Sequence, residues 1–216
     1  MIDAISLRLA MFIQSNSEDA SPNPDKVEIM QYGLSILIFR IITFVITITA
    51  ALFLGTTKYF FVAVITFGAL RVYSGGAHTR SRIQCFASHS IIIFGSIYLA
   101  KWLSPISLAL SIILFSANII ILAIFSPMDT EEKPIVNPKI RLKCKIISII
   151  ISILLSITAI ISYKYDYTIY NIIVLVYIPV LFFITPAGYF ITGSKTSNGK
   201  MMFSYKRNRK GGEKND

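Results

Sequence analysis

Long apolar runs separated by short polar segments dominate the pattern along this chain. Six runs have the composition of candidate membrane helices, and they cover residues 33–54, 59–70, 86–100, 105–125, 146–163 and 167–192. A full transmembrane span needs about 20 residues of helix. The pattern therefore predicts an all-α, polytopic membrane protein with six transmembrane helices.

The second run is short, with only 12 residues between Lys58 and Arg71. A helix of that length spans about 18 Å. It must recruit flanking residues, lie deep in the protein, or stop short of the cytosolic face. A helix that stops short leaves a recess at its end.

Helix boundary signals accompany two of the other runs. Ser104 is a predicted N-cap, with Pro105 at the first helical position of the fourth run. Pro179 and Pro186 lie inside the sixth run and predict kinks there.

The N-terminal segment has a helical spacing of its own. Residues 2–13 predict a short amphipathic helix, which either lies on the inner leaflet or packs back on the bundle. Three regions follow from these patterns: residues 1–24, the amphipathic segment and a loop; residues 25–194, the six-span domain; and residues 195–216, a basic, flexible cytosolic tail.

Composition and charge support a membrane location. The chain has 216 residues, 54% of them hydrophobic, and its mean hydropathy is +0.66. The net charge is +10, but the chain has no soluble basic domain that could bind nucleic acid. Anionic lipid is therefore the expected partner of the basic residues, and nucleic acid is not. The two cysteines give no disulfide framework. The sequence contains no metal-ligand cluster and no nucleotide-binding loop, so no cofactor is expected.

The basic residues also predict an orientation. With six spans, the segments on the side of the N-terminus hold 17 of the 21 Lys and Arg residues, the opposite loops hold three, and Arg40 lies inside the first span. Cytosolic loops carry such an excess, so both termini are predicted to be cytosolic.

The segment RVYSGGAHTRSRIQC, residues 71–85, then faces the cytosol. Cysteine is a strong nucleophile as a thiolate, which helix N-termini, cations and histidine partners favour. Cys85 is at the start of the third run, with Arg80 and Arg82 close to it in the sequence. His78 is a candidate base that takes the thiol proton and returns it to a leaving amine.

The spacing sets a geometric condition on this pair. On one continuous helix His78 and Cys85 would lie about 10 Å apart along the axis, too far for proton transfer. The dyad therefore requires a break in the helix between them. Gly75 and Gly76 provide the freedom for a bend, and their N–H groups are candidate oxyanion donors.

The residues alone leave alternatives open. His89, four residues after Cys85 on the same helical face, is a second candidate base or a span histidine bonded to a neighbouring helix. The whole segment is otherwise a solvated connector with an incidental cysteine. In the second cytosolic loop, Asp129 could orient a catalytic histidine, and Cys144 has no histidine near it in the sequence. Arg40 must pair, face a cavity or snorkel.

RVYSGGAHTRSRIQC followed by SPMDTEEKPI resembles the AgrB family, the accessory gene regulator protein B peptidases of Gram-positive quorum sensing. The similarity extends from about residue 27 to the sixth run. It implies a multi-pass cysteine endopeptidase of the cell membrane with its site on the cytosolic side. The family's catalytic pair falls on His78 and Cys85, and its preceding arginine and glycine fall on Arg71 and Gly76.

The resemblance further implies a substrate, a short AgrD-type precursor peptide. Cys85 would cleave near its C-terminus, and a substrate cysteine would resolve the acyl-enzyme as a cyclic thiolactone. Arg80, Arg82 and Lys133 are candidates for attracting the precursor's acidic tail. Membrane lipids and a second copy of the chain are further expected partners. A small transporter of peptides or solutes is the alternative, and a membrane scaffold would leave the Gly–His–Cys cluster unexplained.

Overall fold

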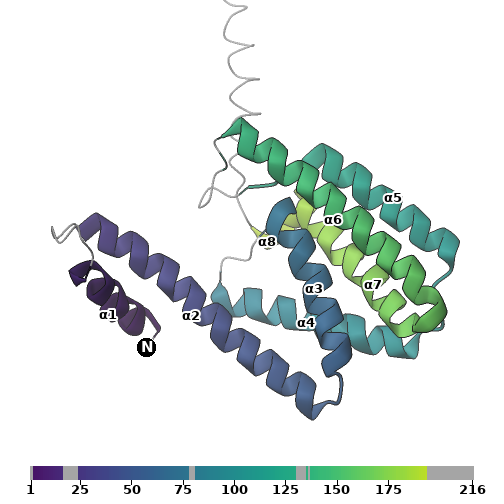
Figure 1. The fold of residues 1–216 in the computed structure, drawn as a ribbon, viewed down its shortest axis with the longest axis horizontal. Coiled ribbons are helices and arrows are strands. Elements are labelled where there is room, and N and C mark those ends of the chain that lie inside the picture. The colour runs from purple at the N-terminus through teal and green to yellow at the C-terminus, as the bar shows by residue number, and fades with distance from the viewer. Residues whose placement is uncertain (1, 17–23, 78–80, 130–134, 136, 194–216) are drawn as a thin grey trace, which may run out of the picture. The chain divides into compact units, whose positions relative to one another are not determined.

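The computed structural model describes residues 2–16, 24–77, 81–129, 135 and 137–193. Within these residues the chain is helical, and its only β-type pairing is one isolated bridge (Figure 1). The helices are α1 (Ile2–Ser15), α2 (Pro24–Phe53), α3 (Thr57–Ser74), α4 (Arg82–Trp102), α5 (Leu108–Phe125), α6 (Pro138–Tyr165), α7 (Tyr167–Ile184) and α8 (Pro186–Thr192). The all-α prediction is confirmed. The chain forms two compact units, Met1–Thr57 and Lys58–Asp216.

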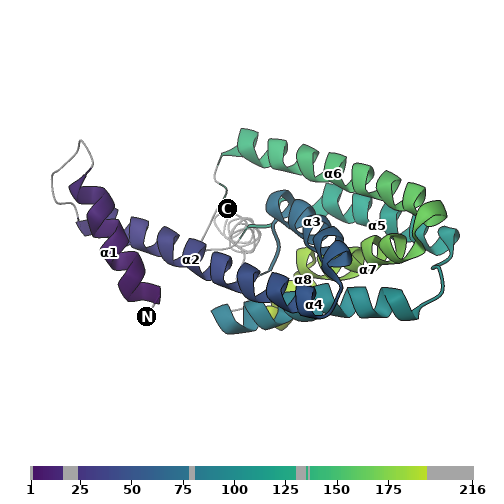
Figure 2. The ribbon, with the colours of Figure 1, turned by 60° about the horizontal axis from the view of Figure 1, so that its bottom comes forward.

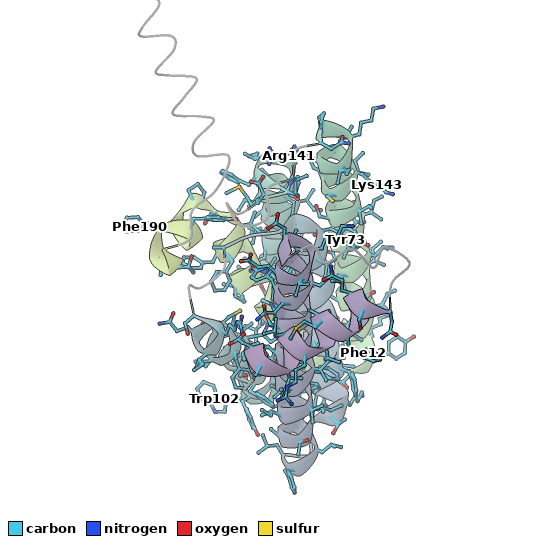
Figure 3. All side chains as sticks on the ribbon, turned by 90° about the vertical axis from the view of Figure 1, so that its left-hand side faces the viewer. Phe12, Tyr73, Trp102, Arg141, Lys143 and Phe190 are labelled. Carbon is cyan, nitrogen blue, oxygen red and sulfur yellow. The ribbon has the colours of Figure 1, made fainter. Side chains whose placement is uncertain are left out.

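In the first unit, the predicted N-terminal helix packs on the first span. Ser6 and Ala10 are the buried positions of α1, and Gln31 of α2 donates a side-chain hydrogen bond of 3.4 Å to the Asp3 carbonyl. The large apolar side chains of α1 are exposed, and Phe12 keeps 67% of its surface (Figure 3). That outward apolar face suits a lipid surface.

Five helices among the described residues are long and apolar enough to cross a membrane. They are Asp25–Phe53, Arg82–Trp102, Leu108–Phe125, Pro138–Tyr165 and Tyr167–Ile184. The predicted second span, α3, is not among them. It does recruit residues at both ends of the predicted run, reaching 18 residues, which corresponds to about 27 Å. A membrane-type helical protein is confirmed, and the sixth span stays a prediction.

In the second unit, α5, α6 and α7 lie side by side, and α7 also packs against α4 and α8 (Figures 1 and 2). On α6 the buried positions are small: Ser148, Ser152, Ser156 and Ala159. Small residues let helix backbones approach closely. Tyr177 of α7 donates across this contact to the Ser152 carbonyl at 2.7 Å. Ten of the 18 residues of α7 are buried, so α7 is the central helix of this unit.

Aromatic rings join α3 to α4. The rings of Phe60 and Phe94 have centroids 6.1 Å apart. Nearer the motif segment, the rings of Phe67 and His89 meet edge to face at 4.8 Å. Through these two ring contacts, the helix before the motif packs against the helix after it.

The start of α5 corrects one prediction. α5 begins at Leu108 with Ser107 as its N-cap, whose hydroxyl accepts from the Leu110 N–H at 3.3 Å. The predicted N-cap Ser104 and first helical residue Pro105 therefore lie outside the helix, and that prediction is wrong.

Asn171 of α7 explains the difference. Its side-chain oxygen accepts from the Ile106 N–H at 3.1 Å. Its amide nitrogen lies within hydrogen-bond distance of three carbonyls, that of Ala100 in the last turn of α4 and those of Leu103 and Ser104 in the connection. Buried backbone polar groups need partners, and here a distant side chain provides them without another helical turn.

The two prolines of the sixth run behave differently. The helix ends at Ile184, and Pro186 is the first residue of the separate helix α8, so the predicted interruption is confirmed there. Pro179 lies within the unbroken length of α7.

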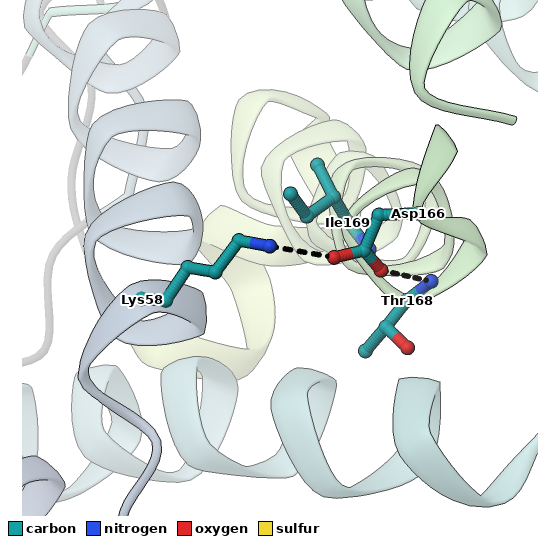
Figure 4. A network of polar contacts seen from close by, with 4 residues as sticks. All are labelled: Lys58, Asp166, Thr168 and Ile169. Atoms are coloured by element: carbon teal, nitrogen blue, oxygen red, sulfur yellow. Dashed lines mark hydrogen bonds and ion pairs between the residues drawn. The ribbon is translucent and has the colours of Figure 1, made fainter. Parts of the chain in front are cut away.

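Asp166 caps the start of α7 and ties it to α3 (Figure 4). Its Oδ1 accepts from the N–H groups of Thr168 at 3.0 Å and Ile169 at 3.3 Å, and its Oδ2 pairs with Lys58 Nζ at 2.9 Å. Burial acts to raise the pKa of this carboxyl, but Lys58 and the two amides outweigh it, so the pKa lies below its ordinary value of 3.8.

Replacing Asp166 by alanine should lower the free energy of unfolding by about 1 kcal/mol through loss of the N-cap. Because the folded-state pKa lies below the unfolded one, the ionised cap stabilises the fold above pH 3.8. That stabilisation disappears as the pH falls through the folded pKa. Asp166→Asn keeps an acceptor oxygen and should lose this pH dependence. Thermal unfolding in detergent from about pH 3 to about pH 7 measures both effects, and an Asp166→Ala variant as stable as the wild type at neutral pH would contradict the capping role.

Candidate functional site

The helix is broken between the two candidate catalytic residues. α3 ends at Ser74, and Ser81, the residue before α4 begins at Arg82, has an extended backbone with φ −105° and ψ 136°, so no continuous helix runs from α3 to Cys85. The sequence-based condition for a His78–Cys85 dyad is therefore met at the level of the backbone. His78 and Arg80 lie outside the described residues.

Gly75 and Gly76 form the first part of this connection by pairing with Met128. Gly75 makes an isolated parallel bridge to Met128, whose N–H donates to the Ser74 carbonyl at 2.9 Å and whose carbonyl accepts from the Gly76 N–H at 3.1 Å. The Gly75 N–H donates to the Arg71 carbonyl at 3.1 Å. Both glycine N–H groups, the candidate oxyanion donors, are thus used to hold the segment itself.

No larger residue fits at either glycine. Gly75 has φ +71° and Gly76 has φ +118°, a region that favours glycine. A Cβ on Gly75 would overlap the Met128 carbonyl, and one on Gly76 would overlap the Arg71 guanidinium and approach the Phe183 carbonyl to 2.9 Å. The glycines are required because two backbones and a guanidinium close around them.

Ala77, the last described residue before His78, is held at both of its backbone polar groups. Its N–H donates to the Phe183 carbonyl at 2.8 Å, and its carbonyl accepts from Arg71 Nη2 at 2.7 Å. Ala77 is 2% exposed. The chain therefore enters position 78 from a fixed point.

The guanidinium of Arg71 contacts two aromatic rings. Its guanidinium carbon is 5.8 Å from the centroid of Phe67 and 5.4 Å from that of Phe183. Cation–π contacts of this kind stabilise a partly desolvated guanidinium. Arg71 thus connects α3 and the end of α7 to the backbone of Ala77.

Cys85 lies in the first turn of α4, where its N–H donates to the carbonyl of the N-cap residue Ser81 at 3.0 Å. Its side chain is half-buried. The dipole of α4 favours negative charge at this end, and Arg82 at the first helical position is exposed. The geometry is suited to a thiol that is reachable yet partly shielded from water.

Asp129 is a buried carboxylate beside the glycine pairing. Its Oδ2 accepts from Arg141 Nη2 at 3.0 Å and from the Ile135 N–H at 3.1 Å. Its backbone carbonyl accepts from the Tyr189 hydroxyl at 3.2 Å. These bonds fix the loop that holds Met128. Asp129 as an orienting group for His78 stays a prediction, and Lys133 lies outside the described residues.

Tyr189 is buried on α8 next to Asp129. Burial raises the pKa of its phenol to about 12; Arg71 acts to lower it and Asp129 to raise it. The phenol is therefore neutral at physiological pH and serves as a hydrogen-bond donor. Phe190, the next residue, points outward from the short helix and is exposed (Figure 3).

Sequence analysis missed three contributors to this site: Met128, Phe183 and Tyr189. Each acts through a backbone group or a long-range contact, and none carries a chemical signature in the sequence. The interruption at Pro186 was the available signal, because a helix end leaves carbonyls that need donors.

The other singled-out polar residues are placed as follows. His89 lies on α4 with its ring against Phe67. Cys144 is a free, half-buried thiol in the second turn of α6, whose first turns also carry Arg141 and Lys143 (Figure 3). Arg40 is exposed on α2. Within the described residues there is no group of His, Cys, Asp and Glu that could hold a metal ion.

Comparison with known proteins gives one consistent family. The family model described as Accessory gene regulator B matches residues 6–185. The "Putative AgrB-like protein 2" of Clostridium perfringens is 28% identical over 151 residues, covering 67% of this chain and 69% of the relative. The "Accessory gene regulator protein B" of Staphylococcus aureus is 27% identical over 151 residues, covering 66% and 76%. That of Staphylococcus intermedius is 27% identical over 124 residues, covering 56% and 64%.

No solved structure matches the chain. The family match includes the glycine pairing, Ala77, Cys85, Asp129 and Phe183, and ends just before α8. Because the family model covers most of the chain, this protein belongs to the accessory gene regulator B family.

Proposed function

We propose that this chain is a membrane-embedded cysteine endopeptidase that processes the peptide precursor of an accessory gene regulator quorum-sensing system. The single observation that carries the proposal is the break between α3 and α4, anchored at Ala77 on one side and ending at the extended N-cap residue Ser81 on the other. Family membership supports the precursor as the substrate.

Chain length limits how far apart the two reactive groups can lie. Four peptide units connect Ala77 to Ser81, which at full extension span about 14 Å. Cys85 follows Ser81 by one helical turn, about 6 Å of rise. His78 is the first residue after the anchored Ala77, so this limit on chain length permits a contact between its imidazole and the thiol. Contact between the two side chains belongs to the proposal.

The chemistry then runs in two transfers. His78 takes the proton of the Cys85 thiol, and the sulfur attacks the carbonyl carbon of a precursor peptide bond. The C–N bond breaks, His78 returns the proton to the leaving amine, and the peptide remains on Cys85 as a thioester. A cysteine within the precursor attacks this thioester, which forms a cyclic thiolactone and restores the Cys85 thiol.

The second transfer replaces one thioester by another and is therefore nearly balanced in free energy. Water competes for the same acyl group. A half-buried sulfur at the start of a membrane-type helix limits that competition by keeping water away. The site is proposed to open to the cytosol, with α3 as a sixth span and both termini inside, in the cell membrane.

Three basic residues are proposed to attract the acidic tail of the precursor: Arg80, Arg82 and Lys133. Of these, Arg82 is described and is exposed one turn before Cys85. An exposed arginine there steers an acidic peptide at long range, an effect that weakens with salt.

Trapping the acyl-enzyme tests the proposal. A precursor whose internal cysteine is replaced by alanine cannot resolve the thioester, so the peptide should accumulate on Cys85 and add the mass of its N-terminal fragment. Mass spectrometry of the digested protein identifies the modified thiol, and Cys144→Ser is the matched control that should leave the adduct unchanged. An adduct on Cys144 in place of Cys85, or release of the C-terminal fragment that persists in Cys85→Ser, would contradict the mechanism.

A further inference from the structure

A continuous row of four side chains connects α7, α3 and α4 beside the candidate site. It consists of Phe183, Arg71, Phe67 and His89, and we call it the Phe67 row. Arg71 lies between the rings of Phe183 and Phe67, at 5.4 Å and 5.8 Å from their centroids. The His89 ring then meets Phe67 edge to face at 4.8 Å and 85°. Phe67 is 7% exposed and therefore buried.

The two ends of the row lie at the two elements that flank the candidate site. At one end, the Phe183 carbonyl accepts from the Ala77 N–H at 2.8 Å, and the adjacent Arg71 donates to the Ala77 carbonyl at 2.7 Å. At the other end, His89 follows Cys85 by four residues and so lies on the same face of α4, one turn further along. The row therefore relates the anchor before His78 to the helix that carries the thiol.

We propose that Phe67 and His89 are positioning residues that set the rotation of α4 and so aim the Cys85 sulfur at the anchored end of the motif segment. The inference rests on the proposed function, because it assigns these residues to the aim of the nucleophile. In this role His89 acts through the packing of its ring, and it does not transfer a proton.

The geometry makes a small rotation costly. An atom about 5 Å from a helix axis moves by roughly 1.7 Å when the helix turns by about 20°. A misplacement of about 1 Å at a reacting atom can cost about 100-fold in rate. Loss of the His89 ring removes the contact nearest Cys85 among the aromatic contacts that join α3 and α4.

The same helix pair offers a matched control. Phe60 and Phe94 also join α3 to α4, with centroids 6.1 Å apart, but Phe94 lies nine residues beyond Cys85. Truncating Phe94 weakens the packing between these helices without touching the row. Comparison of a truncation at Phe94 with one in the Phe67 row separates an effect on the direction of the Cys85 sulfur from an effect on general stability.

The test measures kcat, KM, their pH dependence and thermal stability for precursor cleavage by the full chain in lipid nanodiscs. His89→Leu and Phe67→Leu should each lower kcat by about 10- to 100-fold with KM within about twofold, since the thiol is misaimed after the substrate has bound. His89→Phe keeps the ring and should restore kcat to within about threefold of the wild type. Phe94→Leu should leave kcat within about twofold even where it lowers the melting temperature.

The outcomes separate this inference from the proposed function. If Cys85→Ser still cleaves, the proposed function fails and the inference fails with it. If Cys85→Ser is inactive but His89→Leu keeps full kcat, the inference alone is overturned. If His89→Phe is as inactive as His89→Leu and the pH–rate profile of the residual activity shifts, His89 acts in proton transfer and positioning is again overturned. His89→Phe carries the test even where His89→Leu does not fold.

Discussion

Cys85→Ser should reduce cleavage of the precursor to background, a loss of at least about 1,000-fold in kcat. A serine hydroxyl is a far weaker nucleophile than a thiolate, and it gives up its proton to a histidine base far less readily than a thiol does. The substitution is nearly isosteric, and the Cys85 N–H bond to the Ser81 carbonyl is a backbone contact that remains. The folded protein should therefore persist while its chemistry is lost.

The proposed dyad predicts the behaviour of three further variants in the same measurement. His78→Ala should cause a comparable loss, and the double variant should be no worse than either single one, because groups that act as a unit are non-additive. Cys144→Ser, which removes the other free thiol, should retain wild-type kcat. Immunodetection of the released fragment after co-expression measures all four. Cleavage by Cys85→Ser would end the cysteine-peptidase hypothesis.

Gly75→Ala should abolish activity and destabilise the fold, by about 2–5 kcal/mol in the free energy of unfolding. Its positive φ costs a non-glycine residue about 1–2 kcal/mol, and the added Cβ would overlap a backbone carbonyl, that of Met128, which cannot move as a flexible side chain can. Forcing a methyl group into a closed site adds about 1–3 kcal/mol. The pairing of Gly75 with Met128 should open, and Ala77 should lose its fixed position.

Two other glycines supply controls for the two causes. Gly55 has φ +62° but nothing within 4 Å of the place that an alanine methyl group would occupy, so Gly55→Ala should show the backbone cost alone. Gly68 lies inside α3 with open space around it, and Gly68→Ala should be neutral or stabilising by up to about 1 kcal/mol. Measurements of thermal unfolding and of precursor cleavage should therefore distinguish the three variants from one another. Equal stability of Gly75→Ala and Gly68→Ala would refute the close-packing argument.

The sequence was sufficient for the helical architecture and for the break at the motif. Apolar runs in a membrane-type chain specify helices almost by themselves, because every backbone group must be satisfied within the segment. The glycine pair predicted the bend before His78, since only glycine adopts φ near +118° without strain. The assignment of Cys85 to a helix start followed from the same polar-to-apolar transition.

What the sequence could not provide were contacts between distant backbones. The Ala77 N–H reaches the Phe183 carbonyl over more than 100 residues, and nothing local in either segment indicates it. The non-helical connection before Leu108 depends in the same way on a distant residue, Asn171. Its hydrogen bonds hold the connection in a non-helical form, although Ser104 is an ordinary N-cap residue. Local propensity is a weak guide wherever a distant side chain supplies the missing hydrogen bonds.

The enclosure of α7 by four neighbouring helices has a consequence for motion. Segments with many buried contacts open last in native-state hydrogen exchange, so the amides of α7 should be among the slowest to exchange in this unit. Because the Ala77 N–H donates to the carbonyl of Phe183 near the end of that helix, the amide of Ala77 should exchange nearly as slowly as those of α7.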